Sequence, residues 1–260
     1  MDPGRWNAGE EPELNAAHDD QLRLLDVQAL DSKLDQLAHR SRTLPELADI
    51  DRVGADLTRD RDLLVAAQTE ESDLQREVAK AESDVTAVRD RSSRDRQRME
   101  AGSVGSAKEL EALQHEVMSL AKRQSDLEEI ELDAMERLET AQARAVELSG
   151  RVEALTAEMA ALETRRDDAL AGIEKDAAYV AGERARAATG LPDDLITLYE
   201  KLRADNGGVG AAALHRGRCE GCRLEMTSVD LARIRTASPD EVQRCEECRR
   251  ILIRTADSGL

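Results

Sequence analysis

The stretch Ala101-Gly-Ser-Val-Gly-Ser106 decides the fold, because it separates two long helical patterns. Two glycines in six residues are typical of a turn. Ser106-Ala-Lys-Glu109 then matches a capping box, in which Ser106 and Glu109 accept hydrogen bonds from free amides at a helix start. The flanking patterns, 18–99 and 106–188, are nearly equal in length. They predict an antiparallel hairpin with arms about 120 Å long. Pairing between chains, to give a dimer or tetramer, is the alternative.

Both arms carry the apolar heptad repeat of a left-handed coiled coil. The seam consists of the heptad positions a and d, which recur at alternating steps of three and four residues. Ten of its twelve positions are apolar from Ile50 to Val88, and fourteen of its sixteen positions are apolar from Leu110 to Leu162. The exceptions are Asp60, Glu71, Gln124 and Glu131. We expect these polar residues to fix the register of the arms, with a docking place for a partner as the alternative.

The first arm has one irregularity, at Thr43-Leu-Pro-Glu46. It also matches a capping box, with Pro45 in the first turn of a new helix. We therefore expect residues 18–42 to form a separate helix or a kinked continuation.

All four cysteines of the chain lie near its end, as Cys219-Glu-Gly-Cys222 and Cys245-Glu-Glu-Cys248. Two such pairs predict one tetrahedral metal site. Four thiolates fill every position of one structural Zn²⁺ ion and leave none open for catalysis. Fe²⁺ in the same ligand set and a pair of disulfides are the alternatives. His215 precedes the first pair, and we interpret it as a strand residue and not as a ligand.

The residues around the cysteines predict a small α+β module. A short amphipathic helix is expected over 193–203, a strand over 208–218, a helix capped by Thr227, and a last strand over 249–254. Such a module is too small to hold a core alone, so we expect metal removal to unfold it.

Composition excludes several classes of protein. There is no Phe, and one Trp and two Tyr are present, which favours long helices over a large globular core. No run of 18 apolar residues is present, so no transmembrane span and no membrane partner are expected. The polar N-terminus lacks the apolar core of a signal peptide, and we expect a cytoplasmic protein with reduced thiols. No phosphate loop, hydrolase motif or open metal site appears, so we expect neither an enzyme nor a small-molecule substrate.

Charge is unevenly distributed along the chain. The net charge is −18, yet residues 205–260 hold nine arginines and nine acidic residues. Candidate nucleic-acid contacts therefore lie in this part, because an acidic segment repels nucleic acid. They are Arg216, Arg218, Arg223, Arg249 and Arg250. Compensation of the thiolate charge is the alternative role of the arginines that flank the cysteines.

The sequence resembles a family of bacterial proteins with an N-terminal coiled-coil hairpin and a C-terminal C4-type zinc ribbon. The resemblance rests on Lys108-Glu-Leu-Glu111, Leu198-Tyr-Glu-Lys-Leu-Arg203 and Cys245-Glu-Glu-Cys-Arg-Arg-Ile-Leu252. It implies zinc on Cys219, Cys222, Cys245 and Cys248, and for some members a link to flagellar or type III secretion through an alternative sigma factor, secretion components or RNA. Arg249 stands where the family usually has Gly, and Ile253 where it has an aromatic residue. We expect some backbone strain at Arg249.

The sequence thus predicts a mainly α protein, with a long antiparallel coiled-coil hairpin and a small C-terminal α+β zinc ribbon. The expected parts are a disordered tail (1–17), the hairpin (18–188, turn near 101–105), a connecting helix (189–204) and the ribbon (205–260). We expect a non-enzymatic adaptor or regulator that binds protein partners, as monomer or dimer. Binding of RNA or DNA through the ribbon is the alternative function.

Overall fold

The computed structural model describes residues 14–260 and confirms the mainly α fold. Its helices are α1 (His18–Arg42), α2 (Pro45–Glu100), α3 (Ala107–Ala188), α4 (Asp193–Asp205) and α5 (Ser228–Thr236). Its strands are β1 (Ala211–His215), β2 (Arg218–Cys219), β3 (Gln243–Arg244) and β4 (Ile251–Arg254). The described part of the chain divides into a coiled-coil unit, Glu46–Arg165, and a base unit formed by residues 14–45 and 166–260. Within the described part, no helix combines the length and apolarity needed to cross a membrane.

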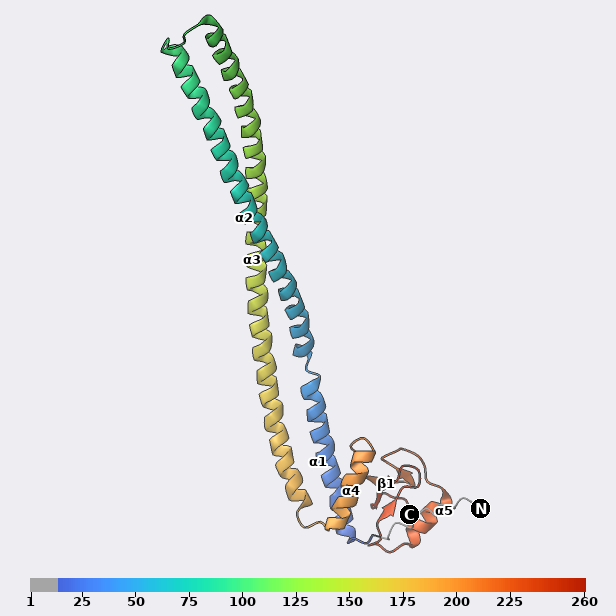
Figure 1. Ribbon diagram of the computed structural model, residues 1–260. Coiled ribbons are helices and arrows are strands. Elements are labelled where there is room, and N and C mark those ends of the chain that lie inside the picture. The colour runs from blue at the N-terminus through green and yellow to red at the C-terminus, as the bar shows by residue number, and fades with distance from the viewer. Residues whose placement is uncertain (1–13) are drawn as a thin grey trace, which may run out of the picture. The chain divides into compact units, whose positions relative to one another are not determined.

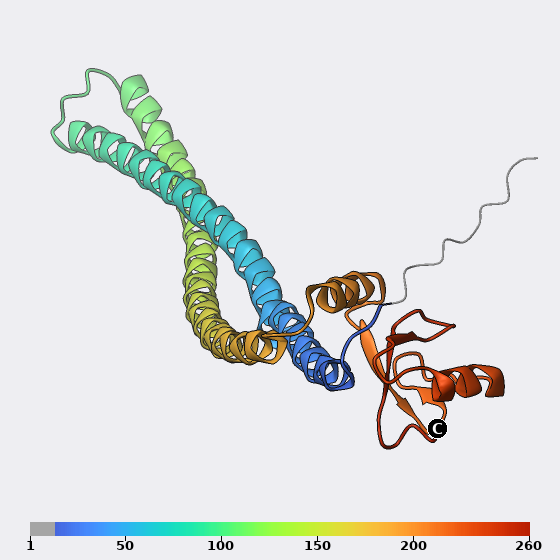
Figure 2. The ribbon, with the colours of Figure 1, turned by 90° about the horizontal axis from the view of Figure 1, so that it is seen from below.

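In the coiled-coil unit, α2 and α3 run side by side in opposite directions and are joined at the glycine turn (Figures 1 and 2). The predicted seams are buried, for example at Val53 and Leu74 of α2 and at Leu127 and Leu148 of α3. Small residues let the helices approach where Ala67 packs against Ala145. Seam packing of this kind gives most of the stability that such long helices have in water.

The capping box at the turn is confirmed, and the one at the start of α2 is wrong. The amide of Glu109 donates to Ser106 Oγ (3.3 Å), and the amide of Gly105 donates to the Glu109 carboxylate (3.0 Å). Thr43 instead closes α1, because its hydroxyl donates to the His39 carbonyl. The helix still restarts at Pro45, which has no N–H to satisfy in a first turn.

Asp60 is the one fully buried charge of the α2 seam, with 0% exposure. Its carboxylate lies 2.7 Å from Nη2 of Arg151 on α3 and 3.3 Å from Nε of Arg59. A buried carboxylate needs such a partner to stay ionised. Because only one alignment of the helices brings Arg151 to Asp60, the contact supports the prediction that Asp60 fixes the register.

In the base unit, α1 packs against α4 and the sheet. Leu24 and Val27 of α1 share a core with Leu195, Tyr199 and Ile253, which the other elements supply. The sheet order is β2-β1-β4-β3, with β1 parallel to β4 and the other pairs antiparallel. The core of the base therefore joins residues from both ends of the sequence.

Two predictions for this unit need correction. The strand expected over 208–218 is two strands, because Arg216 and Gly217 have φ of 49° and 77° and form a tight turn. The first 13 residues of the expected disordered tail lie outside the described residues. Residues 14–17 are held in place, since the Ala16 amide donates to the Asp240 carbonyl (2.8 Å) and the Val242 amide to the Leu14 carbonyl (2.9 Å).

Candidate metal centre

The two Cys-x-x-Cys segments form matching turns. In the first, the Arg223 amide donates to the Cys219 carbonyl (2.7 Å). In the second, the Arg249 amide donates to the Cys245 carbonyl (2.9 Å). Cys219 ends β2 and Cys245 directly follows β3, so the sheet sets the distance between the two turns.

The four sulfur atoms fit one zinc ion. All lie within 4.8 Å of one another, with Sγ–Sγ distances of 3.9 Å for Cys219–Cys248 and 3.8 Å for Cys222–Cys245. Zn–S bonds of about 2.3 Å in a tetrahedron place the sulfurs about 3.8 Å apart. A disulfide would need about 2.05 Å, and all four cysteines are free. The ligand set leaves no position for water or substrate, so the ion has a structural role.

The surroundings of the thiols differ. Burial raises the pKa of Cys219 to about 12 and also raises the pKa of Cys245. Burial acts in the same direction on Cys248, but hydrogen bonds from the backbone and the guanidinium of Arg250, together with those from the Cys245 and Cys222 thiols, outweigh it and lower the pKa of Cys248 to about 7. Arg250 therefore stabilises thiolate charge at the centre, which is the compensating role weighed from the sequence.

Both turns hold an arginine in the left-handed region. Arg223 has φ of 64° and Arg249 has φ of 62°, in the position that directly follows the second cysteine of each pair. This conformation costs a non-glycine residue about 1–2 kcal/mol. The strain expected at Arg249 is thus present at both turns. At Gly221 a side chain has no room, because a Cβ would lie 2.7 Å from Cδ of Arg250.

The five candidate nucleic-acid residues do not form one set. Arg216, Arg218, Arg223 and Arg249 are exposed, and Arg249 lies 3.8 Å from Glu246. Arg250 is half-buried and donates to the carbonyls of Val209 (2.9 Å) and Asn206 (3.0 Å). It therefore ties the second turn to the end of α4, and its contacts are structural.

No sequence pattern singles out Arg254, which organises the loop after α5. Its guanidinium donates to the carbonyls of Ile234, Ala237, Ser238, Pro239 and Glu241. These include carbonyls left free at the end of α5, and a cation at a helix C-terminus is favourable. Arg254 thus holds the segment that leads into the second cysteine pair.

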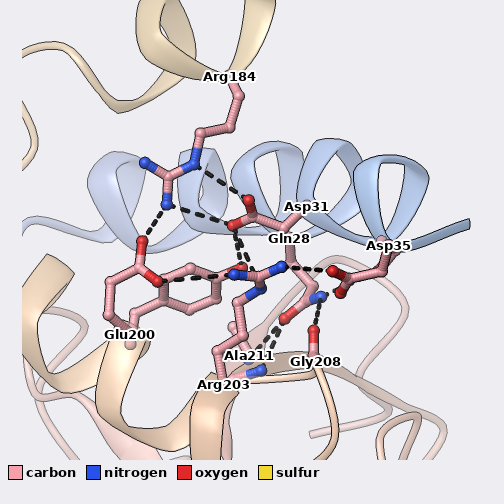
Figure 3. A network of polar contacts seen from close by, with 11 residues as sticks. Gln28, Asp31, Asp35, Arg184, Glu200, Arg203, Gly208 and Ala211 are labelled. Atoms are coloured by element: carbon pink, nitrogen blue, oxygen red, sulfur yellow. Dashed lines mark hydrogen bonds and ion pairs between the residues drawn. The ribbon is translucent and has the colours of Figure 1, made fainter. Parts of the chain in front are cut away.

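A buried polar network joins three helices of the base (Figure 3). Asp31 of α1 is 2% exposed and accepts hydrogen bonds from the hydroxyl of Tyr199 (2.7 Å) and from Nε of Arg184 (3.1 Å). Arg184 also contacts Glu200, and Arg203 donates to Asp35 (2.8 Å). Three helices, α1, α3 and α4, therefore meet at one carboxylate.

Gln28 extends this network to the sheet. Its side-chain carbonyl accepts from the amides of Gly210 (2.7 Å) and Ala211 (3.2 Å), and its amide donates to the Gly208 carbonyl (2.9 Å). The segment that enters β1 is thus fixed to α1. Sequence reasoning missed this network, although the quoted stretch Leu198–Arg203 contains three of its members.

Two family models match the chain. The model of the CT398-like coiled-coil hairpin domain matches residues 27–207, and that of the C4-type zinc ribbon domain matches residues 218–252. An uncharacterised protein of Mycobacterium tuberculosis is 39% identical over 234 residues, which cover 90% of this chain and 95% of the relative. An uncharacterised protein of Mycobacterium leprae is 30% identical over 218 residues, which cover 84% and 93%.

Two solved structures are similar to this chain. A protein from Mycobacterium smegmatis has a TM-score of 0.82 at 37% identity, covering 93% of this chain and 100% of that chain. CT398 from Chlamydia trachomatis has a TM-score of 0.70 at 20% identity, covering 92% and 98%. The second likeness shows the fold alone.

Proposed function

Because this chain belongs to the family of CT398-like coiled-coil hairpin proteins with a C4-type zinc ribbon, we propose that it is a non-enzymatic adaptor or regulator that binds protein partners through its coiled coil and its ribbon. The observation that carries the proposal is the closed set of four thiols, which leaves the metal no catalytic position. The reduced thiols fit a cytoplasmic location.

The network around Asp31 supports the same function. It joins three helices through charge-assisted hydrogen bonds to a buried carboxylate, and the neutral side chain of Gln28 ties the start of the ribbon to α1. An adaptor gains affinity when its binding surface is ordered before the partner arrives.

Two aliphatic side chains of the ribbon are exposed. Leu224 is 52% exposed and Val229 is 75% exposed, on either side of the start of α5. Burial of these side chains against a protein partner would be favourable. We infer that they contact the protein partner, and that Arg223, which is adjacent to Leu224, contributes an ion pair at its rim.

Affinity capture with the full, zinc-loaded chain tests this function. The variant Leu224→Glu/Val229→Glu is expected to lose a protein that the parent chain captures. Ala256→Glu, an exposed position after β4 and outside α5, is the control and is expected to keep it. Recovery of the same protein by all three chains would contradict the surface, and recovery of nucleic acid alone would contradict the function. Identifying the captured protein also tests the link to flagellar or type III secretion that the resemblance implies.

Nucleic-acid binding is the second candidate, favoured by exposed Arg216, Arg218 and Arg223 on the ribbon. Arginine suits bidentate contact with phosphate. Binding of RNA or DNA by the full chain should weaken steeply with salt, and the substitution of these three arginines by Gln should reduce that salt dependence. No binding at low salt would exclude this function.

A further inference from the structure

The four thiols of the metal centre are not equally exposed. Cys219 and Cys245, which begin the two turns, are 0% and 1% exposed. Cys222 and Cys248, which end the turns, are partly exposed. Because oxidation of cysteine follows the exposure of its sulfur, a small oxidant from water reaches the second cysteine of each pair before the first.

The two buried sulfurs are also enclosed by the ribbon itself. Cys219 and Cys245 share a core cluster with Ile234 and Leu252, which are fully buried. Each of the two sulfurs also accepts hydrogen bonds from two backbone amides of its own turn. The first cysteine of each pair is therefore shielded from water and fixed in position.

The two exposed thiols come from different turns and lie next to each other. The thiol of Cys222 forms a hydrogen bond with that of Cys248, and all four sulfurs lie within 4.8 Å of one another. The side chain of Arg250 contacts both turns, since its guanidinium donates to the Cys248 sulfur and its Cδ lies against Gly221. A cation at this place stabilises the negative charge that develops on oxygen when a peroxide bond breaks.

A disulfide between these thiols is incompatible with the bound metal. The tetrahedral spacing of a zinc site keeps the sulfurs about 3.8 Å apart, whereas a disulfide needs about 2.05 Å. The bond also removes two of the four ligands. Arg223 and Arg249, which directly follow the exposed cysteines, have left-handed φ of 64° and 62°, and this strain is relieved when the turns open.

We propose that Cys222 and Cys248 are an oxidative modification site, at which hydrogen peroxide converts the two exposed thiolates into a disulfide between the turns and so releases the metal. One thiolate attacks a peroxide oxygen, the O–O bond breaks, hydroxide leaves, and the sulfur becomes a sulfenic acid. The second thiolate attacks this sulfur, forms the S–S bond and expels a second hydroxide. The two sulfurs together lose two electrons, which the peroxide gains, and the buried cysteines remain thiols.

Release of the metal changes the state of the whole ribbon. Because the ion supplies much of the stability of so small a module, its loss unfolds the strands that it joins. The modification therefore switches the ribbon between a folded, metal-bound form and an unfolded, oxidised form. The proposal rests on the metal centre alone, and it does not depend on which partner the ribbon binds.

Peroxide treatment of the full, zinc-loaded chain tests the proposal. A metallochromic dye measures zinc release, and the remaining thiols are then blocked by alkylation. Trypsin cuts at the arginines that flank each pair, so the two pairs lie on separate peptides, 219–223 and 245–249. The expected first product is the two peptides joined through Cys222 and Cys248, with both buried cysteines alkylated, and it should form in step with zinc release. A thiol reductant and added zinc should restore the parent form.

A double variant separates the exposed thiols from the buried ones. In Cys222→His/Cys248→His, imidazoles replace both exposed thiolates and keep four ligands for zinc, which metal analysis verifies before treatment. This variant should retain zinc at peroxide concentrations that empty the parent chain. If the variant binds no zinc, the peptide map of the parent chain decides the question.

Three results would overturn the proposal. The first is a parent chain that keeps its zinc at peroxide concentrations that oxidise free cysteine. The second is a peptide map in which each peptide is closed on itself, or in which Cys219 or Cys245 is oxidised before the exposed pair. The third is a zinc-loaded histidine variant that loses the metal as fast as the parent chain.

Discussion

Replacement of Asp31 by Ala should loosen α4, which leads into the ribbon, from α1 and α3. The substitution leaves the hydroxyl of fully buried Tyr199 without its 2.7 Å partner, which costs about 1–3 kcal/mol. It also removes one of the two carboxylates that contact Arg184, whose side chain is 24% exposed. Because Arg184 keeps its contact with Glu200, the expected loss in the free energy of unfolding is about 3 kcal/mol. This value is at the lower end for a broken buried ion pair.

Hydrogen exchange as a function of urea measures this loss. The amide of Ala211 reports whether the loosening reaches the ribbon, since Gln28 of the same helix α1 accepts its hydrogen bond. Asp26→Ala, an exposed change on α1, is the control and should shift stability by less than about 0.5 kcal/mol.

Tyr199→Phe should cost about 1 kcal/mol, the usual net value of one hydrogen bond. The double variant Asp31→Ala/Tyr199→Phe should lose less than the sum of the two single losses, because Phe leaves no unsatisfied hydroxyl. Burial and the hydrogen bond to Asp31 raise the pKa of Tyr199 above its usual value. Its stabilisation is therefore complete below the unfolded pKa of about 10 and is lost as pH rises toward the folded pKa. Strict additivity, or the same alkaline slope in the Phe variant, would refute this reasoning.

Removal of zinc by a chelator should abolish exchange protection in residues 211–254 and leave most helical circular dichroism intact, with recovery when zinc is added; persistent protection would contradict a metal-held ribbon. Arg249→Gly should raise the free energy of ribbon unfolding by about 1 kcal/mol, because glycine relieves the left-handed backbone at φ of 62°. Arg249→Val, compared in the same titration, should lower it. Asp60→Leu should leave the free energy of unfolding, measured by thermal denaturation, unchanged or raise it. Arg151→Ala should lower this free energy by about 3 kcal/mol, because it leaves the buried carboxylate of Asp60 without its closer partner.

The sequence was sufficient to predict the hairpin and the metal ligands, because both patterns are local. The heptad seam repeats over consecutive turns, and its burial follows from the 3.5-residue period. Each cysteine pair spans four residues, and its spacing alone indicates the geometry of a metal turn. The helix break before Pro45 was also predicted from the sequence, although the role of Thr43 was not.

The contacts that sequence analysis missed join residues far apart in the chain. Asp31 and Tyr199 are separated by 168 positions, and neither lies in a pattern that names the other. Arg254 resembles any other arginine of the ribbon until the loop carbonyls that surround it are seen. Strand β3, two residues long, is too short for an alternating pattern.

The core of the base also determines how early in synthesis this unit can fold. Leu24 and Val27 leave the ribosome early, yet the residues that cover them include Leu195, Tyr199 and Ile253. At about 5–20 residues per second, roughly 10–50 s pass before this apolar surface is covered. The coiled-coil unit is synthesised within that interval, so we expect it to fold first. Until the last strand emerges, Leu24 and Val27 of α1 stay exposed on the nascent chain, where chaperones can bind them.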